Sequence, residues 1–139
     1  MITKSLKARK DDLSSPKNQL KFLSKGIFEE GELPYFRDKI AETYNLPFKP
    51  KKLEILQLNL GYMCNQVCSH CHVDAGPDRK EIMTVETMKQ CLEVIKNTGA
   101  HTLDLTGGAP EMNPNFRWFV EEAAKAGIQD FIVRSNLTI

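Results

Sequence analysis

The chain has 139 residues, of which 41% are hydrophobic and 27% charged, and its formal net charge is +1. This composition excludes a disordered or a membrane-embedded chain, and the near-zero charge gives no reason to expect nucleic acid or an anionic membrane as a partner. No apolar run reaches the roughly 18 to 20 residues of a bilayer span, and the first residues lack the apolar core of a signal peptide, so we expect a cytoplasmic protein.

Residues 1–50 are expected to form a helical leader that packs on the main unit without being a domain. Ser15 and Pro16 mark a helix start. The apolar positions that follow it are Leu20, Phe22, Leu23 and Ile27. The positions that break the continuation are Gly31, Pro34, Pro47 and Pro50. One or two short helices follow from this pattern, and the basic residues near the start are interpreted as a solvated tail, with an RNA-binding arm as the alternative.

From residue 51 onward, the apolar pattern alternates between that of strands and that of helices. The predicted elements are a largely buried strand at 53–60, a helix from Thr84 to Gly99, a strand at 101–106, a helix from Asn113 to Gly127, and a strand at 130–134. This order predicts parallel β-α-β units with right-handed crossovers. Ligands of such sheets bind at the carboxyl ends of the strands.

The fold class we expect is α/β, as the N-terminal portion of a parallel (β/α) partial TIM-type barrel. The chain ends soon after the third predicted strand, whereas a closed eight-stranded barrel takes about 250 residues. Residues 51–139 are therefore expected to be the first half of a core domain within a longer protein. An open hydrophobic sheet edge would make such a piece poorly soluble by itself.

Three of the four cysteines, Cys64, Cys68 and Cys71, follow the first predicted strand with the spacing C-x3-C-x2-C. Thiolates are the ligands that iron–sulfur clusters and soft metals select. Three thiolates can hold three corners of a [4Fe–4S] cube and leave the fourth iron open. The amine and carboxylate of an amino acid can chelate that iron, as the methionyl end of S-adenosylmethionine would.

Two other uses of these cysteines stay open. A zinc site could combine the three thiolates with His70 or His72, because zinc accepts the same ligands. Alternatively, Cys91 could complete a four-cysteine electron carrier. We interpret Cys91 instead as a small buried apolar residue of a helix. No role is assigned to His72 or Asp74, although both lie beside the cysteines.

Together, the cysteine spacing, the strand before it and the segment LDLTGGAP resemble the radical SAM superfamily over roughly residues 53–139. The resemblance implies that the backbone of His70 contacts adenine, and that the backbone at Gly107 and Gly108 faces the amino group of S-adenosylmethionine. It also implies that Ser135 and Asn136 contact the ribose hydroxyls. Ordinary turns are the alternative for both pairs. Where the superfamily usually has a glutamate after the glycines, this chain has Ala109.

More narrowly, the segments LNLGYMCNQVCSHCHVDAGPDR, LDLTGGAPEMNPNFR and RSNLTI look like those of the arsenosugar biosynthesis radical SAM proteins. This resemblance implies an enzyme that uses a [4Fe–4S] cluster to cleave S-adenosylmethionine and adds the 5′-deoxyadenosyl radical to a methylated trivalent arsenic compound. It also implies a small-molecule substrate and a flavodoxin- or ferredoxin-type electron donor. The alternatives are a radical SAM enzyme that modifies a peptide or another metabolite, and a zinc or electron-transfer module that is not an enzyme.

Overall fold

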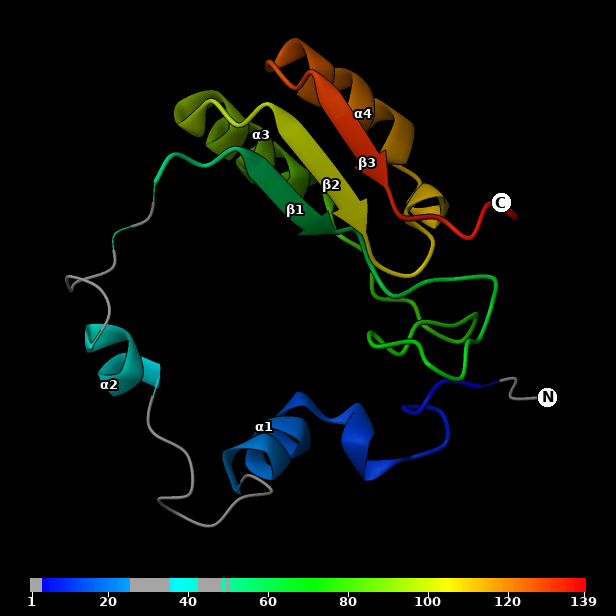
Figure 1. Cartoon of the computed structure of the whole chain (residues 1–139). Coiled ribbons are helices and arrows are strands. Elements are labelled where there is room, and N and C mark those ends of the chain that lie inside the picture. The colour runs from blue at the N-terminus through cyan, green and yellow to red at the C-terminus, as the bar shows by residue number, and fades with distance from the viewer. Residues whose placement is uncertain (1–3, 26–35, 43–48, 50) are drawn as a thin grey trace. The chain divides into compact units, whose positions relative to one another are not determined.

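A computed structural model describes residues 4–25, 36–42, 49 and 51–139 of the chain (Figure 1). The chain divides into two compact units, of which one joins Lys52–Ile139 to the N-terminal residues as far as Asp11, and the other is Asp12–Lys51. Residues 51–139 were predicted to be the core domain, and the boundary at residue 50 stays a prediction. No helix within the described ranges is long and apolar enough to cross a membrane.

The smaller unit contains the short helices that the leader sequence predicts. They are η1 (Asp12–Ser14), α1 (Pro16–Lys25) and α2 (Phe36–Ala41). Helix α1 begins at the predicted Ser15–Pro16 signal, because proline is well suited to the first turn of a helix. Leu20 and Leu23 of its apolar face are exposed. Ile27 and the four predicted chain breakers lie outside the described residues, as does the side chain of Phe22.

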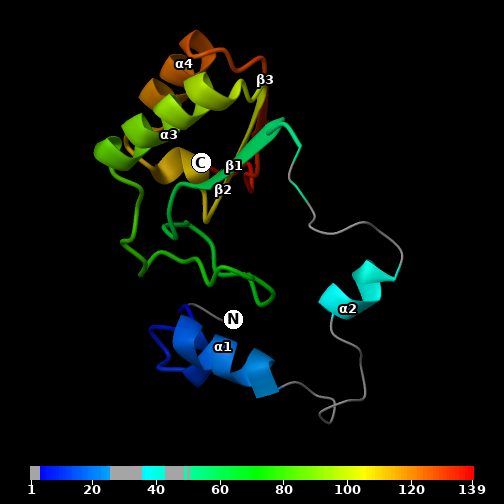
Figure 2. The same cartoon turned by 90° about the vertical axis from the view of Figure 1, so that its left-hand side faces the viewer.

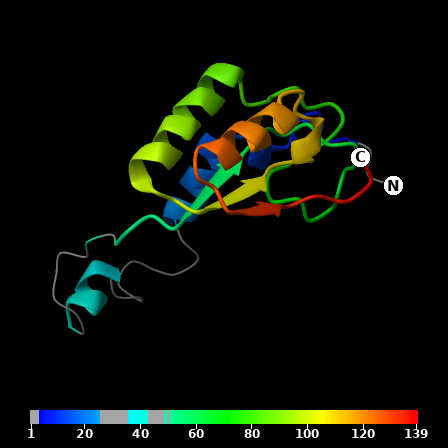
Figure 3. The same cartoon turned by 90° about the horizontal axis from the view of Figure 1, so that it is seen from above.

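The larger unit is a three-stranded parallel sheet in the order β1-β2-β3, with helices between consecutive strands. The strands are β1 (Ile55–Asn59), β2 (Thr102–Thr106) and β3 (Asp130–Val133), and the helices are α3 (Val85–Thr98) and α4 (Phe116–Lys125). Figure 2 shows the two helices alongside each other, and Figure 3 shows both of them on one face of the sheet. The predicted α/β architecture of alternating parallel strands and helices is thereby confirmed, and it is consistent with part of a (β/α) barrel.

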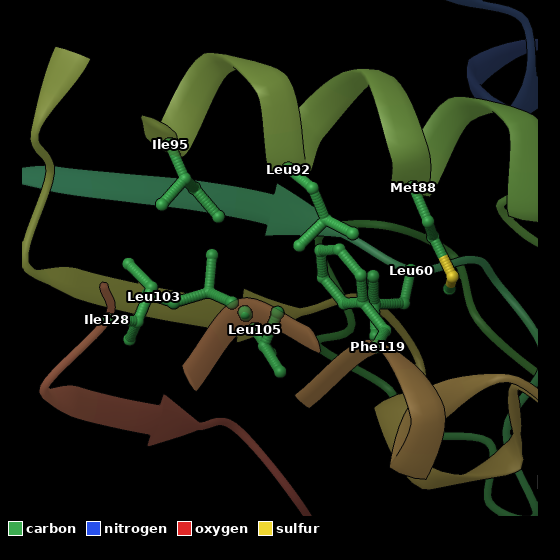
Figure 4. Packing of buried hydrophobic residues seen from close by; sticks show 9 residues of the cluster. Leu60, Met88, Leu92, Ile95, Leu103, Leu105, Phe119 and Ile128 are labelled. Carbon is green, nitrogen blue, oxygen red and sulfur yellow. The ribbon is translucent and has the colours of Figure 1, made fainter. Parts of the chain in front are cut away.

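A single apolar layer holds these helices on the sheet. Met88, Leu92 and Ile95 point from α3 toward the strands, and Phe119 of α4 joins them with none of its surface exposed (Figure 4). Burial of a side chain of this size contributes roughly 1.5–3 kcal/mol. The two ends of α3 are also as predicted: the Thr84 hydroxyl caps the amide of Thr87, and Gly99 ends the helix in the left-handed conformation.

Strand β1 corrects the expectation of a largely buried strand. Leu53 and Ile55 are 38% and 52% exposed, whereas Leu56 and Leu58 are half-buried and only Leu60 is fully buried. Successive side chains of a strand point to opposite faces. Ile55 therefore shares the face opposite the helices with Gln57 and Asn59.

The entry to α4 also differs from the prediction, in which Asn113 and Pro114 open the helix. A short 3-10 helix, η2 (Pro110–Met112), comes first, and α4 starts at Phe116. Asn113 is 3% exposed, and its amide donates to the carbonyls of Leu60 and Met83 at 3.1 and 3.0 Å. This side chain thus joins the loop after β2 to the loop after β1.

Candidate functional site

The loop between β1 and α3, residues 60–83, contains the three clustered cysteines and is called the thiolate loop below. It leaves the carboxyl end of β1 (Figure 1). The loop folds back on itself: the amide of Tyr62 donates to Glu81 O at 2.8 Å, and the amide of Gly76 donates to Tyr62 O at 3.1 Å. The amide of Cys64 donates to Gly76 O at 3.3 Å. These bonds fix the backbone at the first cysteine.

The glycine pair after β2 packs directly against the thiolate loop. The amide of Gly108 donates to Gly61 O, and the amide of Ala109 donates to Met63 O, each at 2.9 Å. A Cβ atom on Gly108 would lie 2.3 Å from Met63 O, and one on Gly107 would lie 2.4 Å from Gly61 O. The glycines are therefore required by the close approach of two backbones.

The three predicted ligands differ in exposure and surroundings. Cys64 is buried, Cys71 is half-buried and Cys68 is exposed. The sulfur of Cys64 accepts hydrogen bonds from Gln66 N at 3.4 Å and from Asn136 Nδ2 at 3.6 Å. The sulfur of Cys71 accepts one from Ala75 N at 3.4 Å. Hydrogen bonds to sulfur orient thiolate ligands and tune the potential of iron–sulfur clusters, so the donor set fits such a cluster.

Within the described residues, no three histidine, cysteine or carboxylate side chains converge as the ligands of one metal ion would. The ligands of a four-iron cube need not converge in this way, since each thiolate binds a different iron. His70 and His72 are exposed. Cys91 packs against the hydrophobic core from α3, and burial raises the pKa of its thiol. This position suits a small apolar residue, although the side chain is half-buried and not fully buried as predicted.

A cavity of about 440 Å³ opens at the carboxyl ends of the strands. Its volume falls within the range of about 300–1,000 Å³ that is usual for small-molecule sites. The cavity adjoins the thiolate loop, and most of its lining residues have polar side chains. The lining residues are Gln57, Asn59, His72, Val73, Thr106 and Arg134. The thiolate loop contributes His72 and Val73, which directly follow Cys71 in the chain.

A polar network that sequence reasoning missed supports this cavity. Asp104 on β2 is 4% exposed and accepts two bonds from Arg134 Nε, at 2.9 and 3.2 Å, and one from Arg134 Nη2 at 2.8 Å. Gln57 Nε2 donates to the same carboxylate at 2.7 Å. An available signal was the single acid between Leu103 and Leu105, because alternation places it on the face opposite the helices.

The hydrogen bonds from Arg134 hold the pKa of Asp104 below its usual range. Because the pKa of Asp104 is lower in the folded than in the unfolded state, its ionised carboxylate stabilises the fold at pH values above the unfolded-state pKa. This stabilisation is lost as the pH falls through the folded-state pKa. Asp104→Asn is therefore expected to reduce the free energy of unfolding at pH 7 and to reduce it less at pH 3. The expected loss at pH 7 is only about 1 kcal/mol, because Arg134 is partly exposed and water weakens the ion pair. Urea unfolding at both pH values measures this. The control is Glu93→Gln, which removes an exposed ion pair with Lys96 and should change the free energy of unfolding little at either pH. An equal loss for Asp104→Asn at both pH values would contradict a lowered pKa for Asp104.

Ser135 and Asn136 follow β3 and reach the same edge of the sheet. The hydroxyl of Ser135 accepts from Leu137 N at 3.0 Å, and Asn136 Oδ1 accepts from Thr138 N at 3.0 Å. These bonds are the turn-type contacts of the alternative interpretation. Asn136 Nδ2 also donates to Asn65 at 2.9 Å, in addition to Cys64. The structure thus joins the end of β3 to the first cysteine.

Comparison with known proteins gives a consistent result. The sequence model of the radical SAM superfamily matches residues 58–139. Over 86 residues, the chain is 23% identical to a probable GTP 3′,8-cyclase of Sulfolobus acidocaldarius and 28% identical to one of Saccharolobus islandicus, covering 62% of this chain and 28% of each relative. It is 26% identical over 66 residues to the antilisterial bacteriocin subtilosin biosynthesis protein AlbA of Bacillus subtilis, covering 48% and 15%. The chain thus spans less than a third of the length of these relatives.

Proposed function

This chain belongs to the radical SAM superfamily, and on that premise we propose that Cys64, Cys68 and Cys71 hold a [4Fe–4S] cluster that acts on S-adenosylmethionine. Members of the superfamily are enzymes that use this cluster and this cosubstrate. The observation that carries the proposal is the thiolate loop itself. It has two cysteine sulfurs that accept N–H bonds, and it lies beside a 440 Å³ cavity at the carboxyl edge of the sheet.

When bound, the reduced cluster supplies the electron that cleaves the 5′-carbon–sulfur bond of S-adenosylmethionine. The residues of this chain would hold and orient the reactants. Asn136 and the backbone of the loop orient Cys64 by donating to its sulfur. Asp104 fixes Arg134 at the rim of the cavity and balances its charge. Preorganised polar groups of this kind position a ligand without reorganising during the reaction.

For S-adenosylmethionine, we propose contacts from the backbone of His70, Gly107 and Gly108, and from Ser135 and Asn136. Their shared position supports this assignment, because the three loops follow strands β1, β2 and β3 at one edge of a parallel sheet. A flavodoxin- or ferredoxin-type protein is the proposed electron donor. Its one-electron chemistry matches the need of the cluster.

We further propose that the deoxyadenosyl group is transferred to a methylated trivalent arsenic compound, in arsenosugar biosynthesis. Methionine would be the leaving group, a carbon–arsenic bond would form, and the arsenic centre would become pentavalent by giving one electron back to the oxidised cluster. The support is the resemblance of three separate segments to that group of radical SAM proteins. A second candidate is a radical SAM enzyme acting on a peptide or another metabolite. The similarity to a GTP 3′,8-cyclase and to a protein of bacteriocin biosynthesis supports this candidate.

The test combines the anaerobically reconstituted protein with dithionite, S-adenosylmethionine and dimethylated trivalent arsenic. Mass spectrometry with arsenic detection should find a product that contains both arsenic and the deoxyadenosyl group. If only 5′-deoxyadenosine and methionine form, the cluster assignment holds and the arsenic substrate is wrong. If neither forms, although the cluster is reduced, the radical SAM proposal itself is contradicted. Omission of the reductant is the control for non-reductive breakdown of S-adenosylmethionine.

A further inference from the structure

The residues near the N-terminus are bound to the thiolate loop, although more than sixty positions separate them in sequence. Ser5 is 1% exposed. Its amide donates to Asp78 Oδ1 at 3.2 Å, and its hydroxyl donates to Asp78 Oδ2. These bonds lower the pKa of the Asp78 carboxyl below its usual range. A residue so deeply buried differs from a freely solvated tail, even though the basic side chains around it are exposed.

Asp74 is the second anchor and lies three residues after Cys71. Its carboxylate accepts from the amides of Leu6 and Lys7, the latter at 3.0 Å, and from Arg79 Nη1 at 3.2 Å. Its own amide donates to Cys71 O at 3.1 Å, and its backbone is left-handed, with φ +51°. This conformation is unfavourable for most residues and persists where surrounding contacts fix it. The bonds to Leu6 and Lys7 are such contacts.

Ion pairs also connect the N-terminal residues to the thiolate loop. Arg79 is 8% exposed, donates from Nε to Glu81 at 3.0 Å, and places its guanidinium 4.6 Å from the centroid of the Tyr62 ring. Lys7 Nζ pairs with the same glutamate. These two cations lower the pKa of Glu81 to about 2. Glu81 O in turn accepts from Tyr62 N, two residues before Cys64. The network therefore joins the N-terminal residues to both sides of the cysteine motif.

We propose that residues Ser5–Lys7, the N-terminal latch, position the thiolate loop for its cluster. The latch satisfies the carboxylates of Asp74 and Asp78, so that the turn after Cys71 keeps one conformation. Without it, Asp74 loses two backbone donors and the left-handed turn loses its support. Ser5, Asp74 and Asp78 are thus positioning residues that act through Cys71. Only the last step of this inference rests on the proposed function: the position of Cys71 affects the cluster because Cys71 is one of its proposed ligands.

The test compares four full-length chains: wild type, Asp74→Asn, Ser5→Ala and the control Glu93→Gln. Hydrogen exchange of the cluster-free proteins, measured by mass spectrometry, reports on the latch itself. Peptides covering residues 4–11 and 71–79 should exchange at least tenfold faster in Asp74→Asn and several-fold faster in Ser5→Ala. Peptides from β2 and α3 should be unchanged. Glu93→Gln removes an exposed carboxylate that pairs with Lys96, and should match wild type throughout.

The same four proteins are then reconstituted, and bound iron, bound sulfide and the electron paramagnetic resonance spectrum of the reduced cluster are recorded. Both latch variants should bind less cluster and give a changed spectrum. Unchanged exchange in both variants would overturn the latch, and faster local exchange with an unchanged cluster would overturn its positioning role. Should Asp74→Asn unfold as a whole, Ser5→Ala decides between these outcomes. A wild-type chain that binds no cluster would overturn the proposed function, whereas the exchange data would still judge the latch contacts.

Discussion

Replacing Cys71 with alanine is expected to lower the iron and sulfide bound after anaerobic reconstitution at least tenfold. Two thiolates cannot hold three corners of a cube, and in Cys71→Ala the bond from Ala75 N to sulfur is lost as well. The reduced wild-type protein should give a [4Fe–4S] signal in electron paramagnetic resonance that shifts when S-adenosylmethionine is added. The variant should give no such signal, with or without S-adenosylmethionine.

Cys91→Ala is the matched control, because it removes a thiol from α3, where the side chain packs against the hydrophobic core. It should bind a normal cluster and lose only about 1 kcal/mol of stability. A cluster lost equally in both variants would instead indicate a four-cysteine electron carrier. Stoichiometric zinc in the wild-type protein, with a spectrum that ignores S-adenosylmethionine, would contradict the radical SAM assignment of this loop.

Gly108→Ala should be strongly damaging to both stability and cluster binding. The added Cβ would lie 2.3 Å from Met63 O and 3.0 Å from the Cβ of Cys64, so the two backbones must separate. Overpacking of this kind costs about 3 kcal/mol when the neighbour is main chain. The separation also breaks the bond from Gly108 N to Gly61 O. We expect a lower midpoint of thermal unfolding and poor cluster binding, measured by circular dichroism and by iron content.

Gly127→Ala distinguishes this steric effect from backbone strain. Gly127 has φ +114°, but a Cβ there would have no atom within 4 Å, and the residue lies before β3, away from the thiolate loop. The substitution should cost about 1–2 kcal/mol of strain and leave cluster binding normal. The contrary result would be that the two variants lose the same stability and bind the same amount of iron. In that case the close approach of the glycine pair to the thiolate loop would not be needed for the cluster.

The sheet and its helices could be predicted because their causes are local. Met88, Leu92 and Ile95 recur at helical spacing, Thr84 and Gly99 are strong end signals, and three short apolar runs alternate with the helices. The position of the cysteines at the carboxyl edge followed from the parallel order of the strands. For the same reason, the order of the elements along the chain was enough to assign the glycine pair and the residues after β3 to that edge.

The missed features depend on partners that are distant in sequence. Asn113 is a favourable residue for a helix start. Its side-chain amide donates instead to the carbonyls of Leu60 and Met83, and the helix starts later. Nothing local in Ser5 indicates that it will be buried against Asp78, because 73 positions separate the two. Arg134 likewise reads as an exposed strand end until Asp104 is known to lie beside it. Pairings of this kind are set by tertiary structure and have no periodic signal in the sequence.

The chain leaves the sheet-bearing unit at Asp11 and returns to it at Lys52. The segment between these points is an insertion between two parts of one body, and it contains η1, α1 and α2. Lengthening a connection whose two ends stay in place costs little entropy, since doubling the length of a flexible loop costs only about 0.6 kcal/mol. Length variation among related sequences should therefore concentrate between residues 12 and 51. The short stretch before it, despite its place at the start of the chain, should vary as little as the interior of the sheet.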